Sequence, residues 1–182
     1  MFHDLFYPHP IVLVTACSSE KANVTAVEWI MPVSDKPPTL ALSLRNTSLT
    51  LDLICTSMEF VVAIPTEKMK EAVLLCGTTS GKFIDKFAEA NLTQVKAKKV
   101  SAPLILEAVA NIECKVQNYT SAGGHTLITG EVVEVHLPKD DRNKLLALSK
   151  EEIAPAPQVL KGTAQQEPAK PAPAQPVKEE PK

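Results

Sequence analysis

A pair of strand-like segments joined by the glycine-rich turn NYTSAGG limits the possible folds of this chain more than any other feature. Residues 110–117 alternate between apolar and polar side chains, and residues 125–137 are strand-like throughout. Two such segments around a glycine turn predict an antiparallel hairpin. In the first segment we expect an inward face of Ala110, Ile112, Cys114 and Val116, and an outward face of Asn111, Glu113, Lys115 and Gln117.

Further strand-like segments precede this hairpin. Residues 11–17 are a continuous β-branched apolar run, which is typical of a buried strand. Residues 24–31 and 59–65 also have strand composition, and Pro32 ends the first of these or marks a sheet edge. Residues 39–45 alternate, so that one face carries Leu40, Leu42 and Leu44 and the other carries Ala41, Ser43 and Arg45. The second face is small, then hydroxylic, then cationic, which suits a ligand-bearing surface.

Three segments between the strands have helical character. They are residues 46–56, residues 67–76 and residues 82–90, the last with Phe83 and Phe87 paired one turn apart. Short helices inserted among five or six strands predict a mainly β fold with helical inserts. We therefore expect a small antiparallel barrel and not a parallel βαβ sheet.

The composition changes sharply near Ala154. Residues 154–182 hold seven of the fifteen prolines and no aromatic residue, so this segment cannot bury enough apolar surface to offset its ordering entropy. We expect one domain over residues 1–153 and a disordered tail rich in Pro, Ala, Lys and Glu over residues 154–182. A tether to a partner and a neutral extension both remain open for the tail.

Charge and hydropathy exclude some classes of partner. The formal charge of −2 gives no electrostatic basis for nucleic-acid binding. No stretch of about 18 apolar residues occurs, and the N-terminus has no signal-peptide pattern, so we expect a cytoplasmic protein without a membrane partner. The cysteines lack metal-ligand spacing and are expected to be buried, reduced thiols without a metal; they are Cys17, Cys55, Cys76 and Cys114.

The stretch CGTTSGKFIDKF, residues 76–87, resembles a phosphate-binding loop but departs from a Walker A motif. Three residues rather than four separate Gly77 from Gly81, Phe83 replaces the Ser or Thr that binds magnesium, and a helix precedes the stretch. Two interpretations remain. The stretch is a corner in which Gly77 ends one helix and Ser80 caps the next, or it is an anion site with Lys82 and Lys86.

A second anion-site candidate is SLRNTSLT, residues 43–50. Arg45 ends a strand, and Asn46, Thr47 and Ser48 begin a helix, so hydroxyl groups, helix N–H groups and a guanidinium converge. An ordinary strand-to-helix junction explains the pattern equally well.

Two further stretches suggest a planar ligand. Trp29, the only tryptophan, lies near Met31, Pro32 and Ser34, and His125 follows two glycines at the start of a strand. These side chains could line an aromatic ring and donate a hydrogen bond or a proton. Taken singly, core packing for the tryptophan and a surface position for the histidine are the more common roles.

Together, in this order, the stretches PHPIVLVT, WIMPVS, SLRNT, CGTTSGKFIDKF and GGHTLITGEV resemble the flavin reductase-like family, which includes flavoredoxin. The resemblance spans residues 8–137 and implies the FMN-binding antiparallel split β-barrel. It implies FMN rather than FAD, NAD(P)H as a transient electron donor, a homodimer with the flavin near the interface, and a small-molecule or protein electron acceptor. The implied function is a flavin reductase-like oxidoreductase; the alternative is a non-catalytic flavin-binding protein or electron carrier.

The resemblance also assigns residues. It implies His125 near the redox end of the pocket and phosphate and ribityl contacts from Ser43, Arg45, Asn46, Thr47 and Ser48. The flavin ring would be lined by Trp29, Met31, Pro32 and Ser34, and a closing loop would contribute Cys76, Ser80, Gly81, Lys82 and Lys86. The chain departs from the family pattern at His9, where a basic residue is common, and in its C-terminal region, which lacks an aromatic, glycine-rich segment.

Overall fold

The predicted hairpin is the longest paired element of the computed structural model, which describes residues 2–19, 21–137, 145–147 and 153–155. Strand β9 (Ala110–Ala122) pairs antiparallel with β10 (His125–His136). Gly123 and Gly124 connect them, and Gly123 has a φ of 62°, which favours a residue without a β-carbon. The hairpin prediction is therefore confirmed, and β9 runs further toward the turn than expected.

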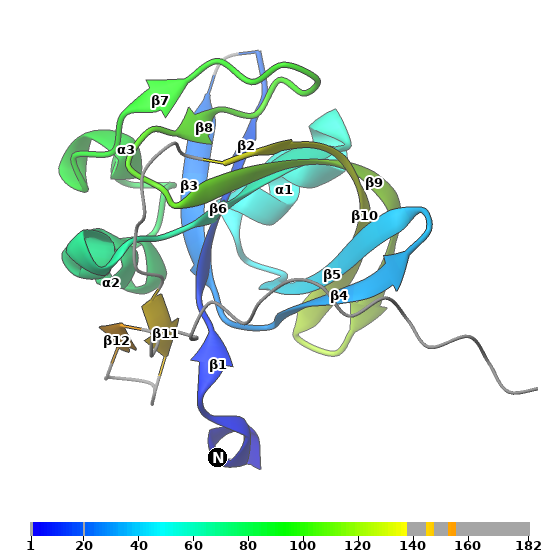
Figure 1. Cartoon of the computed structure of the whole chain (residues 1–182), viewed down its shortest axis with the longest axis horizontal. Coiled ribbons are helices and arrows are strands. Elements are labelled where there is room, and N and C mark those ends of the chain that lie inside the picture. The colour runs from blue at the N-terminus through cyan, green and yellow to red at the C-terminus, as the bar shows by residue number, and fades with distance from the viewer. Residues whose placement is uncertain (1, 20, 138–144, 148–152, 156–182) are drawn as a thin grey trace, which may run out of the picture.

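Seven strands form one curled sheet in which every pairing is antiparallel (Figure 1). Their spatial order is β3-β2-β6-β9-β10-β5-β4, so β3 and β4 are its two edges. The remaining bounds are β2 Val12–Cys17, β3 Ala22–Val27, β4 Ile30–Asp35, β5 Pro38–Arg45 and β6 Glu59–Ile64. This arrangement confirms the predicted mainly β, antiparallel fold class.

Two small sheets accompany the large one. In the first, the order is β1 (His9–Pro10), β11 (Leu145–Ala147) and β12 (Ile153–Pro155). In the second, β7 (Gln94–Val95) pairs with β8 (Leu104–Ile105). Residues 154 and 155 of the predicted tail belong to β12, and the rest of the tail lies outside the described residues.

The helical segments differ in extent from the prediction. Helix α1 covers Leu49–Ser57, η2 covers Glu67–Met69 and α2 covers Lys70–Thr78, while η1 covers Phe2–Phe6. The predicted strand 24–31 is broken at Glu28 and Trp29, and the chain continues as the separate edge strand β4. No helix in the described part of the chain is long and apolar enough to cross a membrane.

The predicted helix over residues 82–90 is wrong in its first half. Helix α3 covers only Lys86–Glu89, because the Asp85 carboxylate accepts the backbone N–H groups of Phe87 and Ala88 and so caps the helix there. Phe83 is consequently in a turn and 87% exposed, whereas Phe87 is buried. The expected Phe83–Phe87 pair is not formed. In the corner interpretation, likewise, α2 ends at Thr78 and not at Gly77, and the cap of α3 is Asp85 and not Ser80.

The core lies on both faces of β2, as its continuous apolar sequence predicts. Ile11 and Leu13 pack with Val73 and Cys76 of α2 in one cluster. Val12 and Val14 pack on the other side, in a cluster with α1 and the inward face of β5 that includes Leu51, Ile54, Leu40, Leu42 and Leu44. The predicted alternation of β5 is therefore confirmed, and the two helices cover opposite faces of β2.

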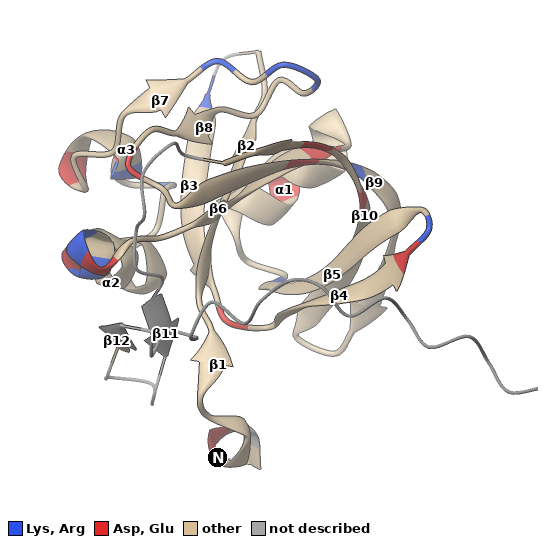
Figure 2. Ribbon diagram, in the orientation of Figure 1, with Lys and Arg blue, Asp and Glu red and all other residues tan. Residues whose placement is uncertain are grey.

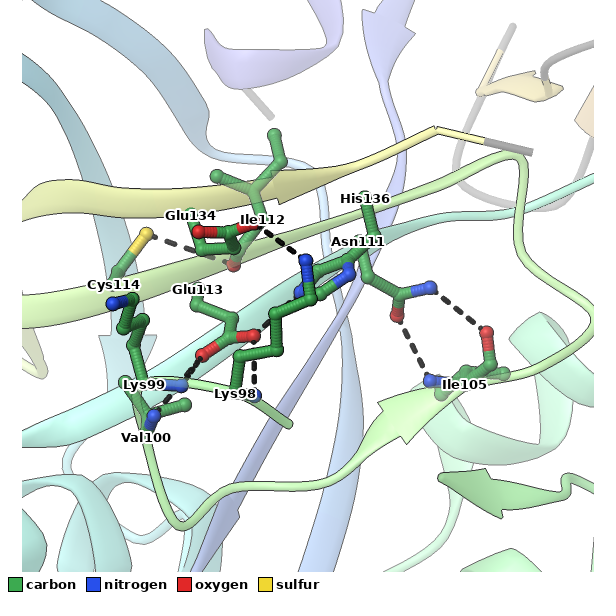
Figure 3. Close-up of polar contacts among 10 residues, drawn as sticks. All are labelled: Lys98, Lys99, Val100, Ile105, Asn111, Ile112, Glu113, Cys114, Glu134 and His136. Carbon is green, nitrogen blue, oxygen red and sulfur yellow. Dashed lines mark hydrogen bonds and ion pairs between the residues drawn. The ribbon is translucent and has the colours of Figure 1, made fainter. Parts of the chain in front are cut away.

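The predicted alternation of β9 is confirmed, since Ile112, Cys114 and Val116 pack in the inner core cluster. On the outward face, however, the side chains of Asn111 and Glu113 are buried. The loop 96–100, whose lysines are drawn blue in Figure 2, contacts this face of β9 through Glu113. Figure 3 shows the Glu113 carboxylate accepting backbone N–H groups from Lys98, Lys99 and Val100 and contacting the His136 imidazole at 2.5 Å. Burial alone would raise the pKa of Glu113, but these hydrogen bonds hold that pKa below its ordinary value.

Candidate functional site

The end of β5 and the start of α1 form a compact junction. The Ser48 N–H donates to the Arg45 carbonyl at 2.9 Å, and Ser48 occupies the N-cap position of α1. Its side chain makes no capping hydrogen bond, and the first hydrogen bond of the helix runs from the Asp52 N–H to the Ser48 carbonyl. The first N–H groups of α1 thus have no acceptor within the helix. Arg45 and Thr47 are exposed beside them.

The corner formed by residues 76–87 docks onto this junction. Gly81 is buried, and a β-carbon built on it would overlap the side chain of Asn23 in β3. The Asn23 Nδ2 atom donates to Thr50 Oγ1 in the first turn of α1 at 2.9 Å. The Lys21 ammonium donates to the Gly81 carbonyl at 2.6 Å. Gly81, Asn23 and Thr50 therefore form a direct chain of contacts from the corner to the helix start.

Lys82 also lies near the start of α1. Its Nζ atom is 3.6 Å from the carboxylate of Asp52 in α1, and both side chains are about half exposed. An ion pair this exposed contributes little to stability. The Lys82–Asp52 ion pair instead holds the Lys82 ammonium near the start of α1. The structure thus brings together the two stretches that the sequence offered as separate anion sites.

Lys86 and Cys76 are engaged inside the fold instead. Lys86 is only 4% exposed, and its ammonium donates to the Cys76 carbonyl at 2.7 Å, which fastens α3 to the last turn of α2. Burial lowers the pKa of Lys86, and burial raises the pKa of the Cys76 thiol to about 11. Ser80 is exposed, and its hydroxyl accepts the Lys82 N–H. Of the two lysines in the corner, Lys82 is the exposed one.

The other cysteines are only partly as expected. Cys114 is buried, but Cys17 and Cys55 are half-buried; all four cysteines are free. The described residues contain no group of three or more His, Cys, Asp and Glu side chains that could hold a metal ion.

The aromatic end of the site lies next to the junction. Trp29 connects β3 to β4, and its carbonyl accepts the Ser43 N–H from β5 at 2.9 Å. Its indole and the His125 imidazole have ring centroids 4.9 Å apart, with an angle of 39° between the ring planes. His125 pairs directly with Arg45 across the β10–β5 ladder. Trp29, Ser43, Arg45 and His125 thus lie together, although they are far apart in the sequence.

The remaining predicted ring-lining residues lie on β4. Met31, Pro32 and Ser34 are exposed on this edge strand, and Met31 is 60% exposed. Next to Trp29, the Glu28 carboxylate accepts the Tyr7 hydroxyl at 2.9 Å. Burial first, and then this carboxylate, raise the pKa of Tyr7 to about 12.

Several residues of this region could not be found from the sequence. Lys21, Asn23 and Thr126 take part in it only through contacts with residues 27 to 80 positions away. No local motif marks such a pairing. Thr126 follows His125 in GGHTL, but nothing in that motif points to its partner, Asn46.

The donor set fits a phosphorylated ligand with a planar ring. A guanidinium, exposed hydroxyl groups, a helix N-terminus and a lysine supply the groups that bind a phosphate. An exposed indole and thioether beside them supply apolar surface for a ring system.

Comparison with known proteins agrees with this geometry. A family model described as the flavin reductase like domain matches residues 3–156. Over 132 residues the chain is 37% identical to an uncharacterized protein of Archaeoglobus fulgidus, covering 72% of this chain and 74% of that protein. It is also 26% identical over 129 residues to an NADH-dependent FMN reductase of Streptomyces nodosus subsp. asukaensis, covering 71% and 69%.

Among solved structures, the flavoredoxin of Desulfovibrio vulgaris (Miyazaki F) superposes with a TM-score of 0.77 at 27% identity, covering 87% of this chain and 92% of that one. The antiparallel fold is thus the split barrel of these proteins. The chain belongs to the flavin reductase-like family, with a flavin-related oxidoreductase role.

Proposed function

We propose that this protein binds FMN and passes electrons from NAD(P)H to the flavin or to an onward acceptor. One observation carries the proposal: the anion-binding groups of Arg45, Lys82 and the α1 N-terminus lie at the same end of the sheet as the Trp29–His125 ring pair. A flavin mononucleotide has a phosphate and a planar ring that match these two sets of groups. The name of the Streptomyces relative supports both FMN and NADH.

The junction would hold the phosphate. The Arg45 guanidinium can form two parallel hydrogen bonds to phosphate oxygens, and the hydroxyl groups of Thr47 and Ser48 can add further donors. The unpaired N–H groups of α1 favour an anion at that position. Lys82 adds a positive charge, which Asp52 keeps close to the helix.

The exposed aromatic end would hold the ring. Trp29 and Met31 present apolar surface, and the His125 imidazole presents a hydrogen-bonding nitrogen beside it. When bound, the flavin supplies the redox chemistry, since it accepts hydride from a reduced nicotinamide. The protein's own residues bind and orient the ligand, and His125 can hold or release a proton at the edge of the site.

Exposed apolar side chains at the edge of the sheet favour a homodimer. β4 is an edge strand, and its Met31 and Val33 side chains are exposed in a single chain, as is Leu127 on the neighbouring part of β10. We propose that a second copy of the chain covers this surface and brings the site to the subunit interface. Light scattering coupled to size-exclusion chromatography should give twice the mass of the chain. A monomer at every concentration tested contradicts the dimer.

The central experiment is a titration with FMN followed by rapid mixing with NADH or NADPH. We expect FMN to quench the fluorescence of Trp29 stoichiometrically, and a reduced nicotinamide to bleach the flavin absorbance. Failure to take up FMN overturns the proposal. Tight FMN binding without bleaching by either donor overturns its catalytic part and favours the non-catalytic flavin-binding or carrier role.

A further inference from the structure

We infer that Asn46 and Thr126 form a clamp that positions the His125 imidazole against the Trp29 indole. Three hydrogen bonds make up this clamp. The Asn46 backbone N–H donates to the Gly124 carbonyl at 3.0 Å, and Asn46 Nδ2 donates to the Gly123 carbonyl at 3.0 Å. The Thr126 hydroxyl donates to Asn46 Oδ1 at 3.0 Å. The clamp therefore grips the chain on both sides of His125.

His125 needs such a restraint because little packs around the turn that precedes it. A β-carbon built on Gly123 or Gly124 would meet nothing within 4 Å, and residues 117–124 are all exposed. Hairpin ends without apolar packing are the parts of a sheet that open most easily. The last pair of the β10–β5 ladder is His125 with Arg45, so Asn46 adds its bonds one residue beyond the end of that ladder.

Asparagine suits this position for a chemical reason. The clamp needs an acceptor for the Thr126 hydroxyl and a donor for the Gly123 carbonyl on the same short side chain, and an amide supplies the two on separate atoms. An aspartate would keep the acceptor but would place a carboxylate oxygen against the Gly123 carbonyl. We therefore assign Asn46 as a positioning residue, with its amide engaged inside the chain, and not as a ligand contact.

The three hydrogen bonds of the clamp fix which groups lie around the His125 imidazole. His125 faces the Trp29 indole at a ring separation of 4.9 Å, and the cationic Arg45 is its partner on β5. Glu28, which precedes Trp29, is the nearest carboxylate along that segment, and it accepts the Tyr7 hydroxyl. The role of His125 in flavin reduction rests on the proposed function, but its contact with Trp29 does not.

The first test uses Trp29, the only tryptophan of the chain, and needs no flavin. The His125 ring packs on the Trp29 indole, so its removal should expose the indole to water and shift the emission maximum to longer wavelength. His125→Asn should show this full shift. Thr126→Val and Asn46→Asp should show part of it, and Thr126→Ser should keep the wild-type emission.

Thr129→Val is the matched control for this test. Thr129 lies on the same strand, and its hydroxyl donates to the Asn118 carbonyl at 3.3 Å, outside the clamp. This variant should show the wild-type emission maximum. A wild-type emission maximum in both Thr126→Val and Asn46→Asp, or no shift in His125→Asn, overturns the clamp. If Thr126→Val does not fold, the comparison of Asn46→Asp with Thr126→Ser decides.

The second test asks whether Thr126 acts through His125. With the FMN-loaded protein, Thr126→Val should slow reduction by NADH without changing the affinity for FMN. In a His125→Ala background, Thr126→Val should cause no further slowing, since residues acting as one unit are not additive. Equal slowing in both backgrounds overturns the inference. A wild-type protein that does not bind FMN refutes the proposed function instead, and the fluorescence test still decides the clamp.

Discussion

A β-carbon at Gly81 would lie 2.6 Å from the Asn23 Cγ atom, so the corner meets β3 with no room for a side chain. Gly81→Ala must displace Asn23, which in turn donates to Thr50 at the start of α1. We expect the free energy of unfolding to fall by about 1–3 kcal/mol, as in other overpacked sites. FMN affinity should fall as well. Urea unfolding and FMN titration measure the two effects.

Gly77→Ala is the matched control. Gly77 lies in the last turn of α2, and its β-carbon would make an ordinary contact of 3.4 Å with Ala26. This variant should be neutral or up to about 1 kcal/mol more stable, because alanine favours a helix. Equal destabilisation by both substitutions would contradict a special role for the Gly81–Asn23 contact.

Arg45→Ala should discriminate between FMN and riboflavin. The lost interaction is with the phosphate, so FMN affinity should fall by about tenfold or more, the typical loss for a hydrogen bond to a charged group. Riboflavin affinity should change little. Isothermal titration with both ligands makes the comparison, and Lys115→Ala, which removes an exposed cation from β9, serves as the control. An equal loss of affinity for FMN and riboflavin would show that Arg45 does not bind the phosphate.

Lys82 and Lys86 should respond to substitution in opposite ways. Lys86→Met removes a buried ammonium that binds the Cys76 carbonyl, so it should lower the thermal midpoint and leave the preference for FMN over riboflavin unchanged. Lys82→Met removes an exposed cation near α1, so it should weaken FMN and leave the thermal midpoint almost unchanged. Thermal unfolding and ligand titration distinguish them. If Lys86→Met lost the preference for FMN over riboflavin, Lys86 would have to contribute to FMN binding.

Glu113 should make the free energy of unfolding depend on pH in the acid range. Its pKa is lowered in the folded protein from a reference value of 4.5, so its stabilising effect is complete above that pH. The effect is lost as the pH falls through the lower folded-state pKa, because the unfolded chain then binds the proton more tightly. Urea unfolding of the wild type should therefore show stability declining below about pH 4.5.

Glu113→Gln tests this assignment. The variant should lose about 3 kcal/mol of stability at neutral pH, as is typical when a buried charged partner is removed. Its stability should also depend less on pH in the acid range than that of the wild type. Glu67→Gln, at an exposed position in η2, should behave like the wild type. The same acid dependence in wild type and Glu113→Gln would show that another group is responsible.

The fold class could be read from local patterns. The alternation of Leu40, Leu42 and Leu44 identified the inward face of β5, because a strand has a period of two. The β-branched run at 11–17 identified a strand buried on both faces, and the glycine pair identified the hairpin. The same rules failed where a helix start depended on one cap, as Asp85 shows in shortening the helix predicted over residues 82–90.

The sequence by itself determined which segments are strands, which stretches carry the groups for an anion and a ring, and which family they resemble. Only the tertiary structure decided how these groups are used. It buried Glu113 under the loop 96–100, turned Lys86 inward to Cys76, and joined Asn46 to Thr126. The physical reason is the range of the interactions. Strand alternation and turn chemistry depend on neighbouring residues, whereas the burial and hydrogen bonding of a polar side chain depend on segments that fold over it from elsewhere in the chain.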